Sequence, residues 1–545
     1  MLPVYKCTFR RGMPIALLVW SLLFLTSSCL SAPKVVFTSS NWPIVIIDTG
    51  GKAIPDLTRI PAAMKVIYNG RGKRNYVSDP ANNYNGRIDI ELRGSSSMAY
   101  PKKGYRLETV DAAGENRNVM LMGMPRENDW ILYGPYNDQS CIRNNLAYGL
   151  SRDMGRYAPR AVFCELVING DYRGLYVMLE KIKEDKNRVS VTEMKPSDIS
   201  GDAVTGGYVI KIDKMEGENV DGWWSRRGIY YQYQEPKQDD IVPEQKVYLR
   251  DFIDAFESSL LISNPSDSAQ GYPKYIDTPS FVDHFILSEF CKNIDAYRIS
   301  TFMHKDRDSK GGKLKAGPIW DFDRTFGMTW YAEDTYRYDE WEIDHNRYKP
   351  EDTPKVPYFW ERLGHDRAFS RLVKARWGEL RLGLLREDSL FKRIDLLVDS
   401  TAEARGRNFQ RWPETAEAHS YEIEIQLLKE WISNRIGWIE SHLDLLASAD
   451  AAGGTPLPGK LQLYPNYPNP FNAGTVIRFS LPAAGTVRLS VHNVTGASVA
   501  TAAERYLPQG QHTWRWEAAG LPGGVYWYRV QAGSLCASGK MLLLR

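Results

Sequence analysis

Short segments in which apolar side chains alternate with polar ones characterise the first third of the chain. Between these segments the chain is rich in Gly, Asn, Asp and Pro. Runs bounded in this way by turn residues predict β-strands. The expected strands are residues 44–47, 64–67, 88–92, 161–168 and 175–179. The Asn169-Gly170 pair between the last two strands is a typical hairpin turn.

A helical spacing of apolar residues replaces this alternation in the second half of the chain. The same spacing already occurs at Ile142, Leu146, Leu150 and Met154, which predicts an amphipathic helix within residues 137–156. Further helices are expected over residues 248–261, 279–295 and most of residues 358–446. The pattern indicates an α+β protein with a β-rich N-terminal half and a helical C-terminal half.

Strand-like alternation returns at the end of the chain, after a stretch rich in Ala, Gly, Pro and Ser. This stretch, residues 447–460, is expected to be a flexible linker. Beyond it, Val487, Leu489 and Val491 alternate with polar residues, and Gly and Pro recur at intervals typical of turns. Residues 461–545 are therefore predicted to form a small all-β domain, an antiparallel sandwich of the immunoglobulin-like kind.

The N-terminus has the layout of a secretory signal peptide. Basic residues precede an apolar run at residues 13–25, and small residues follow it. The run is too short for an ordinary membrane span. We expect residues 1–32 to be removed, which leaves residues 33–446 as the main domain.

Composition and charge limit the partners of the protein. The chain is 43% hydrophobic and 25% charged, which is ordinary for a folded protein. Its 69 basic and 66 acidic residues give a formal net charge of +3, so no charge bias indicates nucleic acid. We expect a monomer that does not bind nucleic acid.

Cysteines are sparse after the predicted signal peptide. The four that remain are Cys141, Cys164, Cys291 and Cys536. They form no CxxC motif and no Cys/His cluster with zinc spacing, so we expect no zinc site. One disulfide bond and four separate buried thiols are both consistent with this pattern.

A loop rich in glycine and serine follows the expected strand at residues 88–92 and carries several cations. Gly94 lets the backbone bend toward an anion, and the serines add hydroxyl donors. The candidate phosphate-binding residues are Arg93, Gly94, Ser95, Ser96, Lys103 and Arg106. If Tyr105 faces the core, alternation sends Arg106 outward and Lys103 inward, where a cation needs a partner. The alternative is a β-hairpin whose polar tip faces solvent.

Two aspartates and two aromatic residues alternate in the segment Trp320-Asp321-Phe322-Asp323. In a strand, both rings would lie on one side and both carboxylates on the other, about 6.6 Å apart. Two like charges held in this way favour a bound cation, so Asp321 and Asp323 are candidate Mg²⁺ ligands. An exposed strand face or a turn would explain them without a metal.

The central region, residues 43–446, resembles the CotH family, the atypical kinases first associated with the spore coat. Ordered motifs carry the resemblance: residues 91–107, 172–181, 206–213, 293–295 and 318–327. The resemblance implies a bilobal atypical kinase-like domain that binds ATP with Mg²⁺ or Mn²⁺. Its implied reaction is transfer of the γ-phosphoryl group to a hydroxyl group.

The resemblance also implies roles for single residues. Asp295 takes the place of the aspartate that accepts the proton of the attacking hydroxyl, although it could also cap the expected helix. Asp321, assisted by Asp323, takes the place of the metal-binding aspartate. Protein kinases place an asparagine for the second metal where this chain has Ser300, so Asn293 is the candidate substitute.

Glu180 and Arg143 complete the predicted site. Glu180 follows the expected strand at residues 175–179, where a bilobal kinase has its hinge for adenine, and an exposed ion pair is the alternative. Arg143 lies on the expected helix, where it is either a phosphate contact or a charged residue of the helix surface.

The C-terminal segment resembles the sorting domain of the type IX secretion system, a bacterial route across the outer membrane. The matching motifs are residues 467–472, 493–496, 521–526 and 539–545. The resemblance implies recognition by the secretion machinery, passage through the periplasm, and a secreted or surface location. A plain immunoglobulin-like module for adhesion or spacing is the alternative.

These features together predict an exported kinase that acts on Ser or Thr of a secreted or surface protein, whose identity the sequence does not give. Two alternatives belong to other functional classes. One is a catalytically inactive surface module for binding or support, and the other is a glycan-acting enzyme with paired carboxylates. Neither HExxH nor GxSxG occurs, so zinc peptidases and α/β-hydrolases have no local support.

Overall fold

The computed structural model describes residues 35–215, 221–328, 336–416 and 420–446 and, with short gaps, residues 461–544. The predicted signal peptide and the predicted linker, residues 447–460, lie outside these described residues. The chain forms two compact units. The larger unit lies within Met1–Tyr358 and Ala375–Ile439, and the smaller unit lies within Phe359–Lys374 and Glu440–Arg545.

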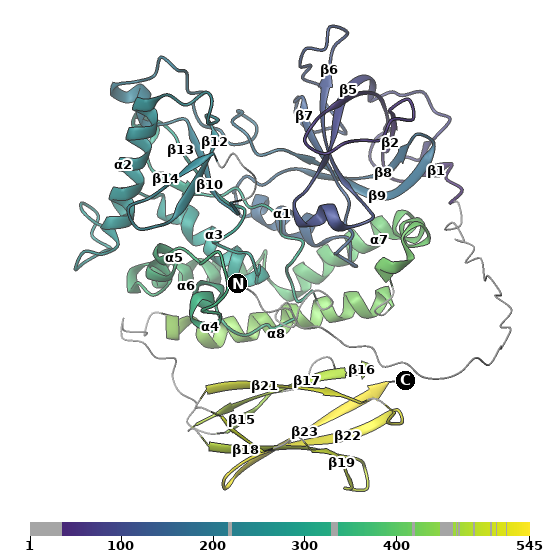
Figure 1. The fold of residues 1–545 in the computed structure, drawn as a ribbon, viewed down its shortest axis with the longest axis vertical. Helices are drawn as coiled ribbons and strands as arrows, with labels where there is room; N and C mark the ends of the chain where they lie inside the picture. Colours follow the sequence, from purple (N-terminus) through teal and green to yellow (C-terminus); the bar gives the residue numbers. More distant parts are fainter. Residues whose placement is uncertain are drawn as a thin grey trace, which may run out of the picture. The chain divides into compact units, whose positions relative to one another are not determined.

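A closed β-barrel forms the first part of the larger unit (Figure 1). Around the barrel the strands are β2 (Ile44–Asp48), β3 (Ile60–Ile67), β5 (Tyr84–Arg93), β6 (Gly104–Val110), β7 (Asp129–Tyr133), β9 (Asp171–Glu180) and β8 (Ala161–Ile168). Neighbouring strands are antiparallel except β2 and β8, which run parallel. The five strands predicted in the first third of the chain are confirmed, because their alternate apolar residues share one buried core. Two short strands, β1 (Ser39–Ser40) and β4 (Asn75–Tyr76), pair with each other.

The hairpin between β8 and β9 turns where the sequence predicts. Asn169 has a φ of 51° and Gly170 has a φ of 75°. Two successive positive φ angles define the turn that Asn-Gly favours between twisted strands. The predicted hairpin is therefore confirmed.

A second sheet follows the barrel in the larger unit, and the sequence patterns did not predict it. In spatial order its strands are β11 (Gly222–Trp224), β12 (Tyr230–Glu235), β10 (Tyr208–Ile212), β13 (Thr301–Lys305) and β14 (Leu314–Ala316). All paired neighbours are antiparallel. The strands are short, and two helices separate β12 from β13 in the chain, so no local pattern links them. The helical half of the chain therefore contains part of a sheet.

The helices that apolar spacing predicts are present. The longer ones are α1 (Arg143–Asp153), α2 (Pro243–Ser259), α3 (Thr278–Cys291), α6 (Arg367–Arg381), α7 (Glu387–Arg411) and α8 (Tyr421–Leu446). The shorter ones are α4 (His345–Tyr348), α5 (Tyr358–Gly364), and the 3₁₀ helices η1 (Ser96–Ala99), η2 (Gly201–Thr205), η3 (Tyr272–Lys274), η4 (Asp308–Lys310), η5 (Glu342–Asp344) and η6 (Pro413–Ala416). Helix α3 ends earlier than predicted because Lys292 adopts a φ of 47°, outside the right-handed helical region. In the described part of the chain, none of the helices combines the length and apolar character needed to cross a membrane.

The C-terminal segment is all-β, as predicted, and contains two sheets. One sheet has the order β15 (Gln462–Leu463), β17 (Gly474–Leu481), β21 (Gly510–Glu517). The other has the order β16 (Phe471–Asn472), β23 (Leu535–Leu544), β22 (Gly524–Ala532), β18 (Gly485–His492), β19 (Ser498–Thr501), with β20 (Arg505–Leu507) also paired to β18. Residues of both sheets share one core, including Ile477 and Val491. The parallel pairing of β16 with β23 corrects the prediction of a wholly antiparallel domain.

The four cysteines within the described residues form no disulfide bond. Cys141, Cys164 and Cys291 are free and buried, whereas Cys536 is free and exposed. Of the two patterns left open by the sequence, the structure therefore has separate thiols, three of which are buried.

Candidate functional site

A cavity of about 590 Å³ in the larger unit is lined by the barrel and by the second sheet with its adjoining loops. Its barrel wall consists of residues from the end of β5, from β6 and β7, and from the segments that follow β5, β7 and β9. Its acidic wall carries Asp213, Asp295, Asp321 and Asp323. The cavity brings together seven residues singled out from the sequence: Arg93, Gly94, Ser95, Arg106, Asp295, Asp321 and Asp323.

The loop between β5 and β6 contributes Gly94, Ser95 and Ser97 to the barrel wall. Gly94 has a φ of 140°, and a Cβ atom at this position would lie 2.0 Å from Oγ of Ser97. Only glycine allows this fold of the loop. The side chain of Ser96 lies outside the described part of the structure. The loop is a polar hairpin tip and it also borders the cavity. This geometry is consistent both with a phosphate-binding loop and with a simple hairpin tip.

Arg93 and Arg106 are the cations that this hairpin adds to the barrel wall. The guanidinium of Arg93 lies over the ring of Trp320, 5.1 Å from the ring centroid. A guanidinium nitrogen of Arg106 lies 3.6 Å from a carboxylate oxygen of Glu91, and another lies 3.5 Å from one of Asp129. The barrel's own carboxylates therefore offset the charge of Arg106.

Lys103 does not lie where alternation predicted. The buried lysine is Lys102, whose Nζ donates hydrogen bonds to the carbonyl oxygen of Leu175 at 2.6 Å and to Oδ1 of Asn408 at 2.7 Å. Burial lowers the pKa of Lys102 to about 7. Lys103 is half-buried, donates to the carbonyl oxygen of Met98, and does not line the cavity. The inward prediction for Lys103 was wrong because β6 begins only at Gly104, so its alternation does not extend back to the lysines.

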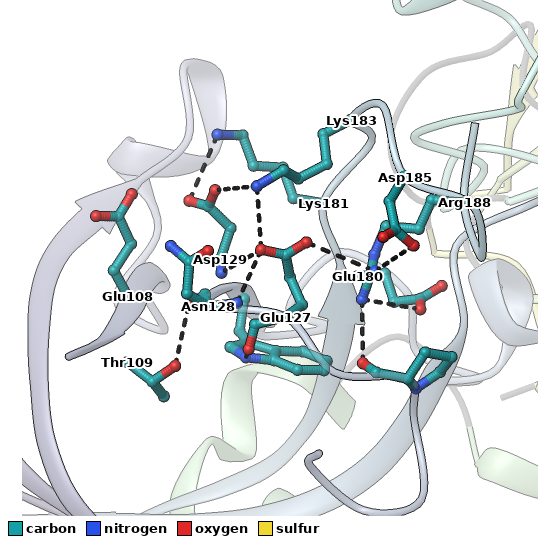
Figure 2. Close-up of polar contacts among 12 residues, drawn as sticks. Glu108, Thr109, Glu127, Asn128, Asp129, Glu180, Lys181, Lys183, Asp185 and Arg188 are labelled. Carbon is teal, nitrogen blue, oxygen red and sulfur yellow. Dashed lines mark hydrogen bonds and ion pairs between the residues drawn. The ribbon is translucent and has the colours of Figure 1, made fainter. Parts of the chain in front are cut away.

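A cluster of carboxylates and lysines supports the barrel wall (Figure 2). Nζ of Lys181 lies 3.5 Å from Asp129, while Nζ of Lys183 lies 3.3 Å from Asp129 and 3.0 Å from Glu127. Burial raises the pKa of Asp129, but Lys181, a hydrogen bond with Glu108, and Lys183 outweigh it and hold this pKa well below its usual range. Lys181 also lines the cavity, although the sequence analysis did not single it out.

The segment around Asp321 and Asp323 is not the predicted strand. It is a loop without regular structure, and Asp321 has a positive φ of 54°, which a strand does not accommodate. Trp320 and Phe322 are nevertheless both buried, and both aspartates line the cavity. Oγ of Ser300 donates a hydrogen bond to Oδ2 of Asp321 at 3.2 Å.

Helix α1 holds this loop in place through its polar residues. The backbone NH of Phe322 donates to Oδ1 of Asn144 at 2.8 Å, and the NH of Asp321 donates to the hydroxyl of Tyr148 at 3.2 Å. Asn144 and Tyr148 are four residues apart, so they lie on one face of the helix. The apolar residues Leu146 and Leu150, which predicted the helix, are buried as well. The helix therefore fixes where the two carboxylates lie.

Both carboxylates of this loop are harder to ionise than usual. Desolvation deep in the cavity raises the pKa of Asp321, with further contributions from Asp213 and Asp295, while Arg93 opposes the shift. Desolvation, and then the charge of Asp321, raise the pKa of Asp323 to about 7. A cation bound beside them would relieve the repulsion.

Asp295 lies in a turn beyond the end of α3, and its carboxylate lines the cavity. Oxygens of this carboxylate are each 3.7 Å from an arginine, Arg298 on one side and Arg324 on the other. The backbone NH of Asp295 donates to Oδ1 of Asn293 at 3.1 Å. Asn293 is buried and does not line the cavity, so its amide serves this turn and the geometry gives no support for its predicted role as a metal ligand.

Glu180 and Arg143 also lie outside the cavity lining, and both are buried in ion pairs. Glu180 lies 2.9 Å from Arg160 and 3.3 Å from Arg188, the second of these residues being visible in Figure 2. Arg143 lies 2.6 Å from Asp138 and 2.8 Å from Glu424. Both side chains have buried ion-pair partners, and the geometry gives no support for their predicted placement at an adenine hinge and at a phosphate.

Several cavity residues were missed by the sequence analysis. They are Tyr133, Asn137, Lys181, Lys211, Asp213, Lys214, Asp221, Ser300 and Arg324. Asp213 accepts a hydrogen bond from the backbone NH of Ser300 at 3.4 Å and lies 3.1 Å from Nζ of Lys211. The sequence feature that could have identified Asp213 is its position at the end of the motif at residues 206–213. That motif contributed to the family resemblance, but no functional role was assigned to its residues.

The oxygen donors of the acidic wall suit a hard divalent cation whose remaining ligands are phosphate oxygens and water. In the described part of the chain, no three His, Cys, Asp or Glu side chains are arranged to hold a metal ion by themselves. Mg²⁺ in phosphoryl-transfer sites typically uses one or two carboxylates together with substrate oxygens and water. Asp321 and Asp323 fit that pattern.

Two family models match the chain. The model described as CotH kinase protein matches residues 90–439, more than half of the chain. The model described as secretion system C-terminal sorting domain matches residues 466–543. A search of curated proteins found no matching relative.

Proposed function

The chain belongs to the CotH kinase protein family, and we propose that it transfers the γ-phosphoryl group of ATP to a hydroxyl group. Its C-terminal sorting domain indicates export by the type IX secretion system to the cell surface or beyond, and thus an interaction with that machinery. The proposed acceptor is a Ser or Thr hydroxyl of a secreted or surface protein, and the proposed active form is a monomer.

One observation carries the proposal: a single cavity holds phosphate-binding groups, metal-binding groups and a candidate base. Phosphoryl transfer requires mainly that charged groups be positioned around the phosphates. The barrel wall offers the loop at Gly94 with Arg93 and Arg106, and the acidic wall offers Asp295 and Asp321. The groups of the two walls are at least 189 positions apart in the chain.

The proposed roles follow from the contacts. Arg93, Arg106 and the donors of the Gly94 loop bind the phosphate oxygens. Asp321 and Asp323 hold Mg²⁺ or Mn²⁺, which when bound neutralises phosphate charge. Asp295 accepts the proton of the acceptor hydroxyl, and the flanking arginines keep its carboxylate oriented.

We also propose finer architectural assignments. The barrel would be the first lobe of a kinase-like arrangement, and the second sheet with its helices would be the second lobe. The two C-terminal sheets would form an immunoglobulin-like sandwich. The shared cavity lining supports the first assignment, and the shared core of the two sheets supports the second.

A glycan-acting enzyme accounts less well for the lining of the cavity. Such an enzyme needs two carboxylates across a groove. This cavity also exposes six cationic side chains: Arg93, Arg106, Lys181, Lys211, Lys214 and Arg324. A polyphosphate ligand explains this density of cations, whereas a neutral sugar does not.

The test is incubation of the purified full-length mature chain with γ-labelled ATP, Mn²⁺ and secreted proteins as acceptors. We expect label in protein, and we expect the Asp321→Asn variant to incorporate none. Nucleotide binding without any transfer would favour the inactive surface module. Absence of both binding and transfer would contradict the proposal.

A further inference from the structure

Four buried polar atoms of residues that line the cavity lack hydrogen-bond partners among the residues that the structure describes. They are Nε of Arg106, the hydroxyl oxygen of Tyr233, Oδ1 of Asn137 and the hydroxyl oxygen of Tyr133, and the last two come from β7 and the segment that follows it. Asn137 is only 6% exposed. Buried polar atoms are rarely left unpaired, so a pair of them beside a cavity indicates a ligand that completes their bonds.

The carboxylates of the acidic wall act electrostatically on the Tyr133 hydroxyl, and Asn137 lines the same cavity. Tyr133 is the last residue of β7, and Asn137 lies in the turn between β7 and α1. Burial, and then the charges of Asp323 and Asp138, raise the pKa of Tyr133, so its hydroxyl keeps its proton. Asp138 is already paired with Arg143 at 2.6 Å, which leaves Asp323 and, with a smaller effect on Tyr133, Asp321 as the nearby carboxylates of the cavity.

The chemistry of these atoms selects a cation. An amide oxygen accepts hydrogen bonds or ligates metals, and it cannot donate. Oδ1 of Asn293 is used by the NH of Asp295, and the hydroxyl of Ser300 donates to Asp321. Asn137 thus supplies a buried amide oxygen of this cavity that no described residue occupies.

We propose that Oδ1 of Asn137 and the carboxylate of Asp323 ligate a divalent cation, Mg²⁺ or Mn²⁺, and that the Tyr133 hydroxyl hydrogen-bonds a water of its hydration shell. The inference rests on the proposed nucleotide function, because phosphate oxygens would complete the shell. Hard oxygen donors, few carboxylates and retained waters are what Mg²⁺ prefers. Asn137 would then be the amide ligand of the metal, the role that the sequence analysis expected of Asn293.

A matched control lies two residues away. Gln139 is 7% exposed, and its Oε1 also has no hydrogen-bond partner among the described residues. Gln139 does not line the cavity. A general effect of removing a buried amide from this segment would appear in both residues, whereas an effect on the cation would appear only in Asn137.

The experiment is a titration of the full-length mature chain with Mn²⁺, followed by electron paramagnetic resonance, with and without a non-hydrolysable ATP analogue. We expect Asn137→Ala to weaken Mn²⁺ binding about tenfold or more, the usual range for groups that tune a metal site. Asn137→Asp should retain binding because a carboxylate oxygen replaces the amide oxygen. Tyr133→Phe should weaken binding by less, and Gln139→Ala should leave it unchanged.

Thermal melting of each variant separates lost binding from lost folding. If Asn137→Ala fails to fold, Asn137→Asp and Tyr133→Phe still decide the question. Unchanged Mn²⁺ affinity in folded Asn137→Ala and Tyr133→Phe, with normal nucleotide binding, would overturn this inference alone. A wild-type chain that binds neither Mn²⁺ nor nucleotide would overturn the proposed function and this inference together.

Discussion

The barrel wall and the acidic wall of the cavity differ in how their charges are balanced. On the barrel wall, Arg106 and Lys181 both lie 3.5 Å from Asp129, so the barrel offsets its own cations. On the acidic wall, desolvation and then neighbouring carboxylates raise the pKa values of Asp321 and Asp323, and nearby cations do not outweigh this rise. The barrel wall is a preformed set of hydrogen-bond donors, whereas a bound cation would stabilise the ionised carboxylates of the acidic wall. A metal-bound polyphosphate would satisfy both.

The two walls also differ in what supports them. The barrel wall rests on strand pairing and on the carboxylate and lysine cluster of Figure 2. On the acidic wall, the loop that carries Asp321 and Asp323 is held by side chains of α1. We therefore expect substitutions on the acidic wall to affect the ligand more than they affect folding.

The largest expected effect is that of Asp295→Asn. If Asp295 is the general base, turnover should fall about 10²- to 10⁴-fold, because that is the usual contribution of such a group. Affinity for ATP should stay the same, since Asp295 contacts the acceptor hydroxyl and not the nucleotide. The measurement is the steady-state rate of phosphate transfer, together with nucleotide binding by calorimetry.

Asp254→Asn is the control for this change. Asp254 also faces an arginine, with one carboxylate oxygen 3.1 Å from Arg226, but it lies outside the cavity lining. Its turnover should match that of the wild type. Wild-type turnover in Asp295→Asn would contradict the general-base role and would favour the alternative, in which Asp295 only caps the preceding helix.

A smaller effect is expected from Asn144→Ala, which removes the support of the acidic wall. The backbone NH of Phe322 would lose its partner at a cost of about 1–3 kcal/mol, and the loop would loosen. Nucleotide affinity measured with Mg²⁺ should fall, while the barrel stays folded. Asn145, one residue further along α1, donates a hydrogen bond to the carbonyl oxygen of Ala161 instead. Asn145→Ala should therefore leave nucleotide affinity unchanged. Equal loss in both variants would mean that α1 supports the fold in general and not the loop.

The smallest effect concerns pH and the buried lysine of the barrel. The pKa of Lys102 falls from 10.5 to about 7 on folding. Between these values the unfolded chain binds a proton that the folded barrel does not, so stability should rise with pH, by at most about 1.4 kcal/mol per pH unit. Urea unfolding at several pH values should show this slope, and Lys102→Met should remove it.

Glu257 provides the opposite case in the region beyond the barrel. Burial raises its pKa from 4.5 to about 7, although Tyr231 and Ser225 donate hydrogen bonds to it. The folded state therefore holds a proton that the unfolded chain has lost, and stability should fall as pH rises through this range. Glu257→Gln should flatten the fall. Identical pH profiles in wild type and both variants would show that neither group titrates as described.

The sequence predicted five of the seven barrel strands, the Asn169-Gly170 turn and the main helices because their patterns are local and periodic. It also identified three of the four aspartates of the acidic wall, Asp295, Asp321 and Asp323. It failed where periodicity ends: the strand proposed at Asp321 is a loop with positive φ, and Lys103 exchanged roles with Lys102. Contacts such as the one between Asn144 and Phe322 join residues 178 positions apart, and no local pattern reports them.

The central claim is that the cavity binds a nucleotide together with a divalent cation held by Asp321. Its most direct test is calorimetric titration of the full-length mature chain with a non-hydrolysable ATP analogue, in Mg²⁺ and in EDTA, for wild type and Asp321→Asn. We predict that wild type binds the analogue in Mg²⁺ and loses most affinity in EDTA. Asp321→Asn should bind weakly in both, with stability changed by less than about 1 kcal/mol because the side chain is exposed to the cavity. Wild-type affinity in Asp321→Asn, still dependent on Mg²⁺, would contradict the account.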